Sequence, residues 1–396
     1  MNARELEVLK ERTQAFVQEV VIPAEAHEPS AGVDEAMRRD LQSQARAAGV
    51  FAPHAPVSLG GGGLDLYEQS VIFEEAGYSL LGPVALNCAA PDEGNMHLLE
   101  IVGTPEQKDR YLRPLAAGDV RSCFAMTEPA PGAGSDPSML LTTARPKAGG
   151  WVLNGRKWLI TGAEGAAFAI CMARTGKTDD AATMFLVDAT NAGFTVTRHV
   201  PTPDKSMPGG HAEVVFDNCF VPDDAVLGAP HQGFRYAQVR LVPARLTHCM
   251  RWLGIARRSL DIALDQTAGR DAFGSPIQEL GLAQALIADS VIDIESSRAV
   301  IREACRAIVA GDRGTGASSV AKVSVSEAVF RVIDRATQLC GGAGVTDELP
   351  LTRYLIEARA FRIYDGPSEV HRWAIARRAA RTRERLRQPA SGGAGE

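Results

Sequence analysis

Apolar side chains recur with a helical period through the first part of the chain, from residue 3 to about residue 117. They return every three or four residues, the spacing that gives a helix one apolar stripe. Thr104 is followed three residues later by Gln107, a capping-box pattern that predicts the start of a helix. Residues 1–119 are therefore predicted to form an N-terminal helical domain.

Near Asp119 the pattern changes to short runs rich in β-branched and aromatic residues. Turn sequences such as Asn154-Gly155 separate these runs. The runs cover residues 122–126, 151–153, 168–171, 184–187, 194–196 and 213–216. About seven short strands predict a small β-barrel or sandwich, placed at residues 120–228.

After Gly228 the helical period returns and stays. Four long segments follow, at residues 240–267, 280–310, 318–338 and 367–385. Four such segments predict a four-helix bundle over residues 229–387, and the Gly/Ala/Ser-rich residues 388–396 are predicted to be a disordered tail. The fold class is α+β, and we expect a ligand where the three domains meet.

Composition narrows the chemistry. The net charge of −6 in 396 residues leaves no basic footprint for nucleic acid. No apolar run reaches the length of a membrane span, and the charged N-terminus does not resemble a signal peptide, so a cytoplasmic protein is expected. Seven scattered cysteines predict buried thiols rather than disulfides, and the eight histidines lack ligand spacing, which predicts no metal site. Any difficult chemistry would therefore have to come from an organic cofactor or from carboxylates.

Two turns of the predicted β domain carry candidate binding groups. In residues 124–138 small residues allow backbone N–H groups to approach an anion, and Thr127 and Ser135 add hydroxyls. The second turn combines Trp158 with the Thr161 hydroxyl, which would suit the edge of a flavin ring. A tryptophan in a strand is more often part of the core.

A lone carboxylate, Asp365, stands at a break between two helical segments, before Gly366 and Pro367. At such a break it can point into a cavity and take part in catalysis. It can equally cap the helix that follows, because aspartate is a favoured cap residue. The stretch alone gives the two interpretations similar weight.

Five motifs in order resemble the acyl-CoA dehydrogenase family, and the likeness covers nearly the whole chain. The motifs are Thr127-Glu128-Pro129 with Gly134-Ser135-Asp136, Trp158 with Thr161, Arg270-Asp271-Ala272-Phe273-Gly274, Gln338-Leu339-Cys340-Gly341-Gly342-Ala343-Gly344 and Tyr364-Asp365-Gly366. Finer details, such as Asp365-Gly366-Pro367-Ser368-Glu369-Val370-His371, resemble the branch of members ten and eleven. The resemblance implies an FAD-dependent flavoprotein oxidoreductase with three domains, and a homotetramer or dimer.

The resemblance also implies which residues bind FAD, some of them in a neighbouring subunit. Residues of the middle domain would contact the flavin and its phosphates, whereas those of the helical domain would reach FAD held mainly by another copy, and two would border its adenosine or ribityl end. The residues of the middle domain are Phe124, Met126, Thr127, Ser135, Leu159, Ile160 and Thr161. The residues that would reach FAD of another copy are Arg270, Phe273, Gln338, Gly341 and Gly342. The residues at the adenosine or ribityl end are Pro367 and Glu369. Leu159 occupies the place that tryptophan usually takes in the family.

The implied reaction is α,β-dehydrogenation of an acyl thioester such as an acyl-CoA. A base removes the α-proton, and the β-hydrogen leaves as hydride to flavin N5. Most members use glutamate as the base; here the matching residue is Asp365, and the position that some relatives use instead is Ala244. We expect desolvation between flavin and substrate to raise the pKa of this base toward working pH. Ser135, Arg245 and Gly366 would bind substrate, and an electron-transferring flavoprotein would accept the electrons.

Three alternatives remain open from the sequence. The chain could be a flavin oxidase of the nitroalkane-oxidase type, which also uses aspartate, a dehydrogenase of carrier-tethered acyl groups, or an inactive CoA-binding protein. Aspartate is one methylene shorter than glutamate, and a shift of about 1 Å can cost roughly a hundredfold in rate. We therefore hypothesise that Asp365 serves a bulkier or substituted acyl group.

Overall fold

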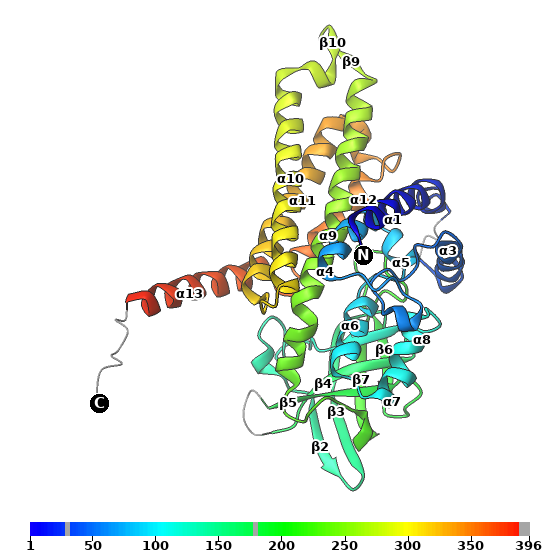
Figure 1. Ribbon diagram of the computed structural model, residues 1–396, viewed down its shortest axis with the longest axis vertical. Coiled ribbons are helices and arrows are strands. Elements are labelled where there is room, and N and C mark those ends of the chain that lie inside the picture. The colour runs from blue at the N-terminus through cyan, green and yellow to red at the C-terminus, as the bar shows by residue number, and fades with distance from the viewer. Residues whose placement is uncertain (28–31, 177–180, 388–396) are drawn as a thin grey trace.

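The computed structural model describes residues 1–27, 32–176 and 181–387, and the predicted tail lies outside them. Helices open the chain, a β-sheet follows, and long helices close it (Figure 1). The sheet lies at one end of the molecule and the far tips of the long helices at the other. No helix among the described residues is both long and apolar enough to cross a membrane.

The N-terminal part is helical, as the apolar period predicts. Its helices are α1 Ala3–Phe16, α2 Ile22–Glu25, α3 Glu35–Ala47, α4 Leu66–Ala76, α5 Gly82–Ala85, α6 Asp92–Val102, α7 Pro105–Gln107 and α8 Arg113–Ala116, with π-helical turns at Val17–Val21 and Lys108–Leu112. The predicted capping box at α7 is confirmed, since Thr104 Oγ1 accepts from the Gln107 N–H at 3.2 Å and Gln107 Oε1 accepts from the Thr104 N–H at 3.1 Å.

The middle part forms one eight-stranded sheet. Its strands are β1 Ser122–Ala125, β2 Thr143–Lys147, β3 Gly150–Thr161, β4 Phe168–Arg174, β5 Ala182–Asp188, β6 Phe194–His199, β7 His211–Pro222 and β8 Val226–Leu227. The order is β6-β7-β3-β2-β4-β5-β8, and β1 pairs in parallel with β4. The pairing of β3 with β7 shifts register between Lys157 and Ile160, which marks a β-bulge.

The C-terminal part is helical, with differences at its ends. Its helices are α9 Gly233–Ala268, α10 Gly281–Val309, α11 Thr315–Cys340, α12 Leu351–Phe361 and α13 Ser368–Arg387, and the hairpin of β9 Asp271–Ala272 and β10 Ser275–Pro276 joins α9 to α10. α9 begins earlier than the predicted residue 240 and continues through Pro243. α13 buries only Ser368 and His371 and extends away from the other helices (Figure 1), so the expected fourth bundle helix packs mainly through its first turn.

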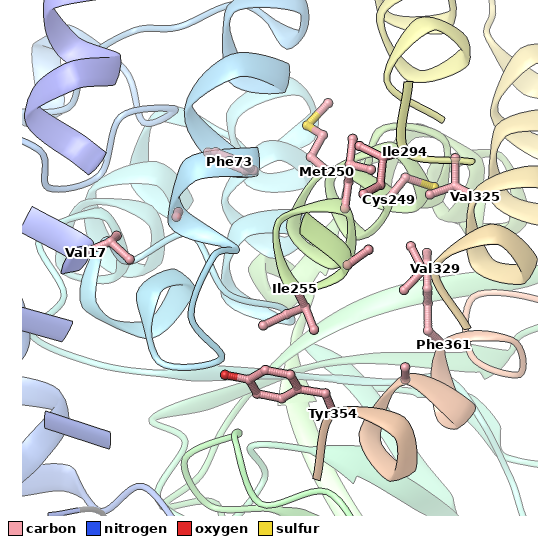
Figure 2. Close-up of a cluster of buried hydrophobic side chains, with 14 of the residues drawn as sticks. Val17, Phe73, Cys249, Met250, Ile255, Ile294, Val325, Val329, Tyr354 and Phe361 are labelled. Atoms are coloured by element: carbon pink, nitrogen blue, oxygen red, sulfur yellow. The ribbon is translucent and has the colours of Figure 1, made fainter. Parts of the chain in front are cut away.

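One apolar core joins the first and last parts of the chain. Figure 2 shows Phe73 of α4, Met250 of α9, Val325 of α11 and Tyr354 of α12 in one buried cluster. All seven cysteines are buried and free, which confirms the expectation of buried thiols. Because the core crosses from α4 to α12, these helices hold one another in place around the junction near Asp365.

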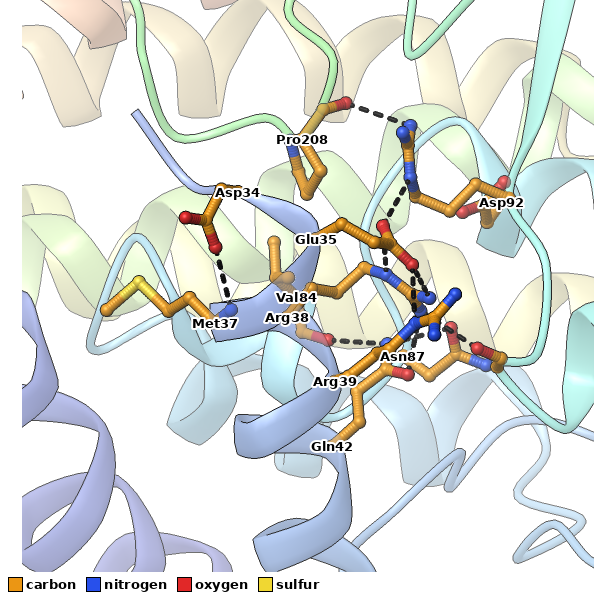
Figure 3. Close-up of polar contacts among 12 residues, drawn as sticks. Asp34, Glu35, Met37, Arg38, Arg39, Gln42, Val84, Asn87, Asp92 and Pro208 are labelled. Atoms are coloured by element: carbon orange, nitrogen blue, oxygen red, sulfur yellow. Dashed lines mark hydrogen bonds and ion pairs between the residues drawn. The ribbon is translucent and has the colours of Figure 1, made fainter. Parts of the chain in front are cut away.

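A polar network ties α3 to neighbouring segments (Figure 3). The Glu35 carboxylate accepts from Arg38, from Arg39 Nε at 3.0 Å and from Arg121 Nε at 3.3 Å. Arg121 also donates to the Pro208 carbonyl at 3.1 Å, so the network reaches the loop before β7. Burial raises the pKa of Glu35, but the arginine contacts outweigh it and bring the pKa to about 2.

Candidate active site

Asp365 lies in the turn between α12 and α13, and its backbone is fixed from two sides. Its carbonyl accepts from Arg245 Nε on α9 at 3.0 Å and from His371 Nε2 on α13 at 3.1 Å. Asp365 adopts φ 53° and Gly366 φ 100°, both in the left-handed region. A Cβ at Gly366 would come within 2.7 Å of His371 Nε2, so only glycine fits. The fixed main chain therefore determines the position from which the Asp365 side chain extends.

The carboxylate itself is left without a hydrogen bond. Asp365 Oδ2 is buried and has no hydrogen-bond partner among the described residues, although 18% of the side chain is exposed and His248 Nε2 lies 3.4 Å from Oδ2. The Ser368 N–H at the start of α13 donates to the Arg362 carbonyl at 3.2 Å. The capping interpretation thus finds no support in the contacts of Oδ2, and an unpaired buried carboxylate is typical of a functional site.

Cations near the Asp365 carboxylate hold its pKa below the usual value. Burial raises the pKa, as predicted, but the charges of His248, Arg240, Arg245 and Lys322 lower it by more, so it lies below the usual value. Burial brings the pKa of His248 itself down to about 3, so that ring is neutral at physiological pH. The Asp365 carboxylate is ionised at neutral pH, and the rise expected from desolvation between flavin and substrate stays a prediction.

The buried Lys322 and the Phe361 ring pack against the turn that carries Asp365. Lys322 on α11 donates to the Phe361 carbonyl at 2.6 Å, and its Nζ lies 4.6 Å from the centre of the Phe361 ring. Burial lowers the pKa of Lys322 to about 8. Our sequence reasoning missed this residue. Its signal was a lysine on the apolar stripe of α11, between Ala321 and Val325.

No carboxylate competes with Asp365 from α9. The position that some relatives use for the base is Ala244, which is 3% exposed and has only a methyl group. Its neighbour Arg245 reaches the Asp365 carbonyl, so the Arg245 side chain holds the turn rather than pairing with the carboxylate. The structure therefore brings together Asp365, Arg245 and Gly366 of the predicted site.

A buried ion pair holds the predicted phosphate-binding loop. Lys157 Nζ lies 2.9 Å from Glu128 Oε1 and also donates to the Met126 carbonyl at 3.0 Å. Glu128 accepts further from the N–H groups of Leu141 and Thr142 at 2.7 and 2.8 Å. Glu128 belongs to one of the motifs that resemble the family, but its pairing with Lys157 was not predicted from the sequence. The pair fixes both ends of the loop that carries Thr127, half-buried, and Ser135, exposed.

The β-bulge turns one predicted flavin contact outward. Leu159 has φ 53° and is 40% exposed, whereas Ile160 is 1% exposed and belongs to the core. The Trp158 N–H donates to the Thr127 carbonyl at 3.1 Å, which joins the two predicted turns. The bulge therefore presents Leu159 at the surface and keeps Ile160, also predicted to bind the cofactor, inside the sheet.

The Thr161 hydroxyl at the end of β3 is part of a chain of polar contacts. It lies 3.0 Å from His211 Nδ1, and His211 Nε2 lies 2.8 Å from Asp204 Oδ2. The ring of Phe124 on β1 has the guanidinium of Arg240, from α9, 4.0 Å from its centre. Both predicted contacts are thus held in place by charged or polar neighbours.

A second set of predicted cofactor residues lies far from the sheet. Arg270 and Phe273 belong to the hairpin at the tip of the long helices, opposite the β domain (Figure 1). Gly341 joins them, since a Cβ on it would lie 3.9 Å from Arg270 Nη1, and Gln338 precedes it at the end of α11. Phe273 is 96% exposed. Within one chain, these residues do not meet the first set.

The groups around the bulge fit the flavin that the resemblance implies. Met126 and Leu159 offer apolar contact for a ring, and the hydroxyls of Thr127 and Thr161 suit its polar edge. Gly134 has open space where a Cβ would be, so a ligand can approach the loop backbone. Pro367, half-buried, and Glu369, exposed, lie at the start of α13. Among the described residues no cluster of three or more histidine, cysteine or acidic side chains could hold a metal ion.

Comparisons with known proteins agree with this arrangement. The chain matches the acyl-CoA dehydrogenase N-terminal domain at residues 3–119, the middle domain at residues 123–219 and the C-terminal domain at residues 231–380. It is 40% identical to Probable acyl-CoA dehydrogenase FadE2 of Mycobacterium tuberculosis, over 80% of this chain and 79% of that protein. It is 36% identical to mouse acyl-CoA dehydrogenase family member 10 over 96% of this chain, which spans only 37% of that longer protein.

Solved structures give the same result. Butyryl-CoA dehydrogenase from Megasphaera elsdenii superimposes with a TM-score of 0.86 at 26% identity, covering 95% of this chain and 98% of the other. A glutaryl-CoA dehydrogenase from Mycobacterium smegmatis, solved in complex with FADH2, gives a TM-score of 0.85 at 25% identity, covering 96% and 95%. With all three domains matched in order, the chain belongs to the acyl-CoA dehydrogenase family of FAD-dependent oxidoreductases.

Proposed function

We propose that the protein dehydrogenates the α,β-bond of an acyl thioester and that Asp365 is the base that removes the α-proton. One observation carries this proposal: Asp365 Oδ2 is buried and accepts no hydrogen bond from the described residues, in a turn whose backbone is held by Arg245 and His371. A carboxylate kept ionised and free of hydrogen bonds is ready to accept a proton.

The residues of this chain would divide the work as follows. Arg245 and His371 fix the main chain at the base, and Gly366 allows the close approach of His371. The Asp365 backbone N–H would donate to the thioester carbonyl and stabilise the negative charge that develops as the α-proton leaves. Bound FAD supplies the acceptor for the β-hydrogen. Thr127, Leu159 and Thr161 would position its ring.

A second copy of the chain would complete the FAD site. This part of the proposal is supported by the separation of the two sets of predicted FAD residues and by the exposure of Phe273. A homodimer or homotetramer would bring the helical tip of one copy to the FAD of another. Electron-transferring flavoprotein would then accept the electrons, and the acyl carrier would be CoA.

The test of the base replaces Asp365→Asn, which removes the negative charge at nearly the same volume. We expect the variant to keep FAD and to lose flavin bleaching by acyl-CoA in stopped-flow absorbance. Asp334→Asn, an exposed position on α11, is the matched control and should bleach like the wild type. A reductive rate unchanged in Asp365→Asn would overturn the assignment, and peroxide release during turnover would point to an oxidase instead.

A further inference from the structure

His248 lies between the base and a buried arginine on the same helix. Its Nε2 is 3.4 Å from Asp365 Oδ2, the oxygen that has no hydrogen bond, and its Nδ1 is 3.2 Å from Arg251 Nη2. Arg251 is itself held, because its Nη1 donates to the Cys88 carbonyl at 2.8 Å and lies 3.5 Å from Glu93 Oε2. A continuous chain therefore runs from Glu93 to Asp365.

Arg251 determines which nitrogen of His248 carries the hydrogen. A guanidinium only donates, so His248 Nδ1 must accept and the ring proton of neutral His248 sits on Nε2. That Nε2–H lies on the side of the ring nearest the Asp365 carboxylate. Burial and the Arg251 charge hold the His248 pKa at about 3, so the ring stays a neutral donor across the physiological range.

The ring is also fixed by packing. Its centre lies 4.7 Å from the Tyr364 ring and 6.3 Å from the Phe361 ring. Trp252, on the next turn of α9, donates to the Tyr364 hydroxyl. These aromatic neighbours restrict the plane of the His248 ring and so limit the directions in which Nε2–H can point.

We infer that His248, kept in its Nε2–H form by Arg251, is a positioning residue that directs the Asp365 carboxylate during proton abstraction. It would donate to Oδ2 and so leave the other carboxylate oxygen to take the α-proton. This inference rests on the proposed role of Asp365 as the base. The 3.4 Å separation is longer than a good hydrogen bond, and catalytic contacts of this kind shorten when substrate closes the site.

We expect the bleaching rate to fall at low pH, and the pH of this acid limb is a readout that a purely structural role of His248 would leave unchanged. The charged or titratable groups facing the pair are Arg240, Arg245, Cys249 and Arg251 from α9, Lys322 from α11, Glu93 from α6, Tyr364 from the turn and His371 from α13. Removing only the His248 donor leaves all of these in place. The ionised base then loses a stabilising partner, and the pH at which it protonates must rise.

The experiment compares His248→Phe with His248→Gln in the FAD-loaded, full-length protein. Phenylalanine keeps the aromatic packing and removes the donor, whereas the glutamine amide nitrogen can replace Nε2–H. We expect flavin bleaching by acyl-CoA to slow by about 10- to 100-fold in the phenylalanine variant, with its acid limb moved to higher pH. Glutamine should restore most of the rate and the original limb. The exposed His27→Phe is the control.

Each outcome decides between the two proposals. If Asp365→Asn still bleaches, the base assignment fails and the role of His248 falls with it. If Asp365→Asn does not bleach but His248→Phe retains the wild-type rate and pH profile, only the His248 inference is overturned. Equal losses in the phenylalanine and glutamine variants, with the acid limb unmoved, would also overturn it, because they would show a packing role.

Discussion

The two sets of predicted cofactor residues are built in opposite ways. The set on the sheet is braced within the chain, since the loop carrying Thr127 is held by the buried pair of Glu128 and Lys157. The set on the helical tip is open, and Phe273 there is 96% exposed. This contrast is what we expect if another copy of the chain completes the FAD site, as proposed above.

The largest effect is expected from breaking the braced set with Glu128→Gln. Lys157 would then be a buried charge without its partner, which costs about 3–5 kcal/mol in the free energy of unfolding. Urea unfolding at neutral pH measures this loss. Glu303→Gln removes the carboxylate from an exposed pair with Arg306 and should change stability by less than about 1 kcal/mol. Equal losses in the free energy of unfolding for the two variants would show that the pair of Glu128 and Lys157 does not stabilise the loop.

The same pair gives a pH dependence with a defined sign. Burial raises the pKa of Glu128, but the Lys157 charge and the N–H contacts of its loop outweigh it and bring the pKa to about 2. Since this lies below the ordinary value of about 4.5, the stabilisation is complete above pH 4.5 and is lost as the pH falls toward 2. The stability gap between wild type and Glu128→Gln should therefore narrow over that window.

The next effect concerns the fixed end of the site, where Asp365→Glu adds one methylene to the base. The turn is held by Arg245, so the longer side chain must reach into the substrate space. We expect the bleaching rate with the best wild-type substrate to fall by about a hundredfold. Relative preference should move toward straight-chain acyl thioesters. A wild-type enzyme that already prefers short straight chains would contradict our hypothesis of a bulkier or substituted acyl group.

The smallest effect is expected from the open set, with Phe273→Ser at the helical tip. Burying a phenylalanine against a partner contributes about 1.5–3 kcal/mol, so FAD should bind roughly tenfold more weakly or worse. Urea unfolding of the monomeric chain should not change, because Phe273 has few contacts within the chain. Val57→Ser, at a position 72% exposed, is the control. Unaltered FAD binding and oligomeric state would show that the tip has no partner.

Much of the fold could be predicted because it follows from local periodicity. The apolar stripes located the helices, and the Thr104 and Gln107 spacing located a helix start that the structure confirms. The start of α9 at Gly233 could not be predicted in this way, because no side-chain cap at Gln232 marks it. Pro243 normally disfavours a helix interior, yet α9 continues through it, as does the predicted segment at residues 240–267.

The site was harder to predict because its electrostatics depend on distant residues. Lys322 and Arg240 lie on different helices, and only folding places both near Asp365. The sequence therefore points to Asp365 as the proposed base but does not reveal the cations that lower its pKa. The pair of Glu128 and Lys157 was missed for the same reason, since 29 positions separate them along the chain.

The two hydrogen bonds to the Asp365 carbonyl have a consequence for which substitutions the protein can accept during evolution. Arg245 and His371 bind the main-chain carbonyl of Asp365 and form no hydrogen bond with its side chain. A replacement of the acid there leaves the anchor untouched. If Asp365 is the base, as proposed, a carboxylate of different length could take its place without changes in the surrounding helices, and the acyl groups that react could change with it.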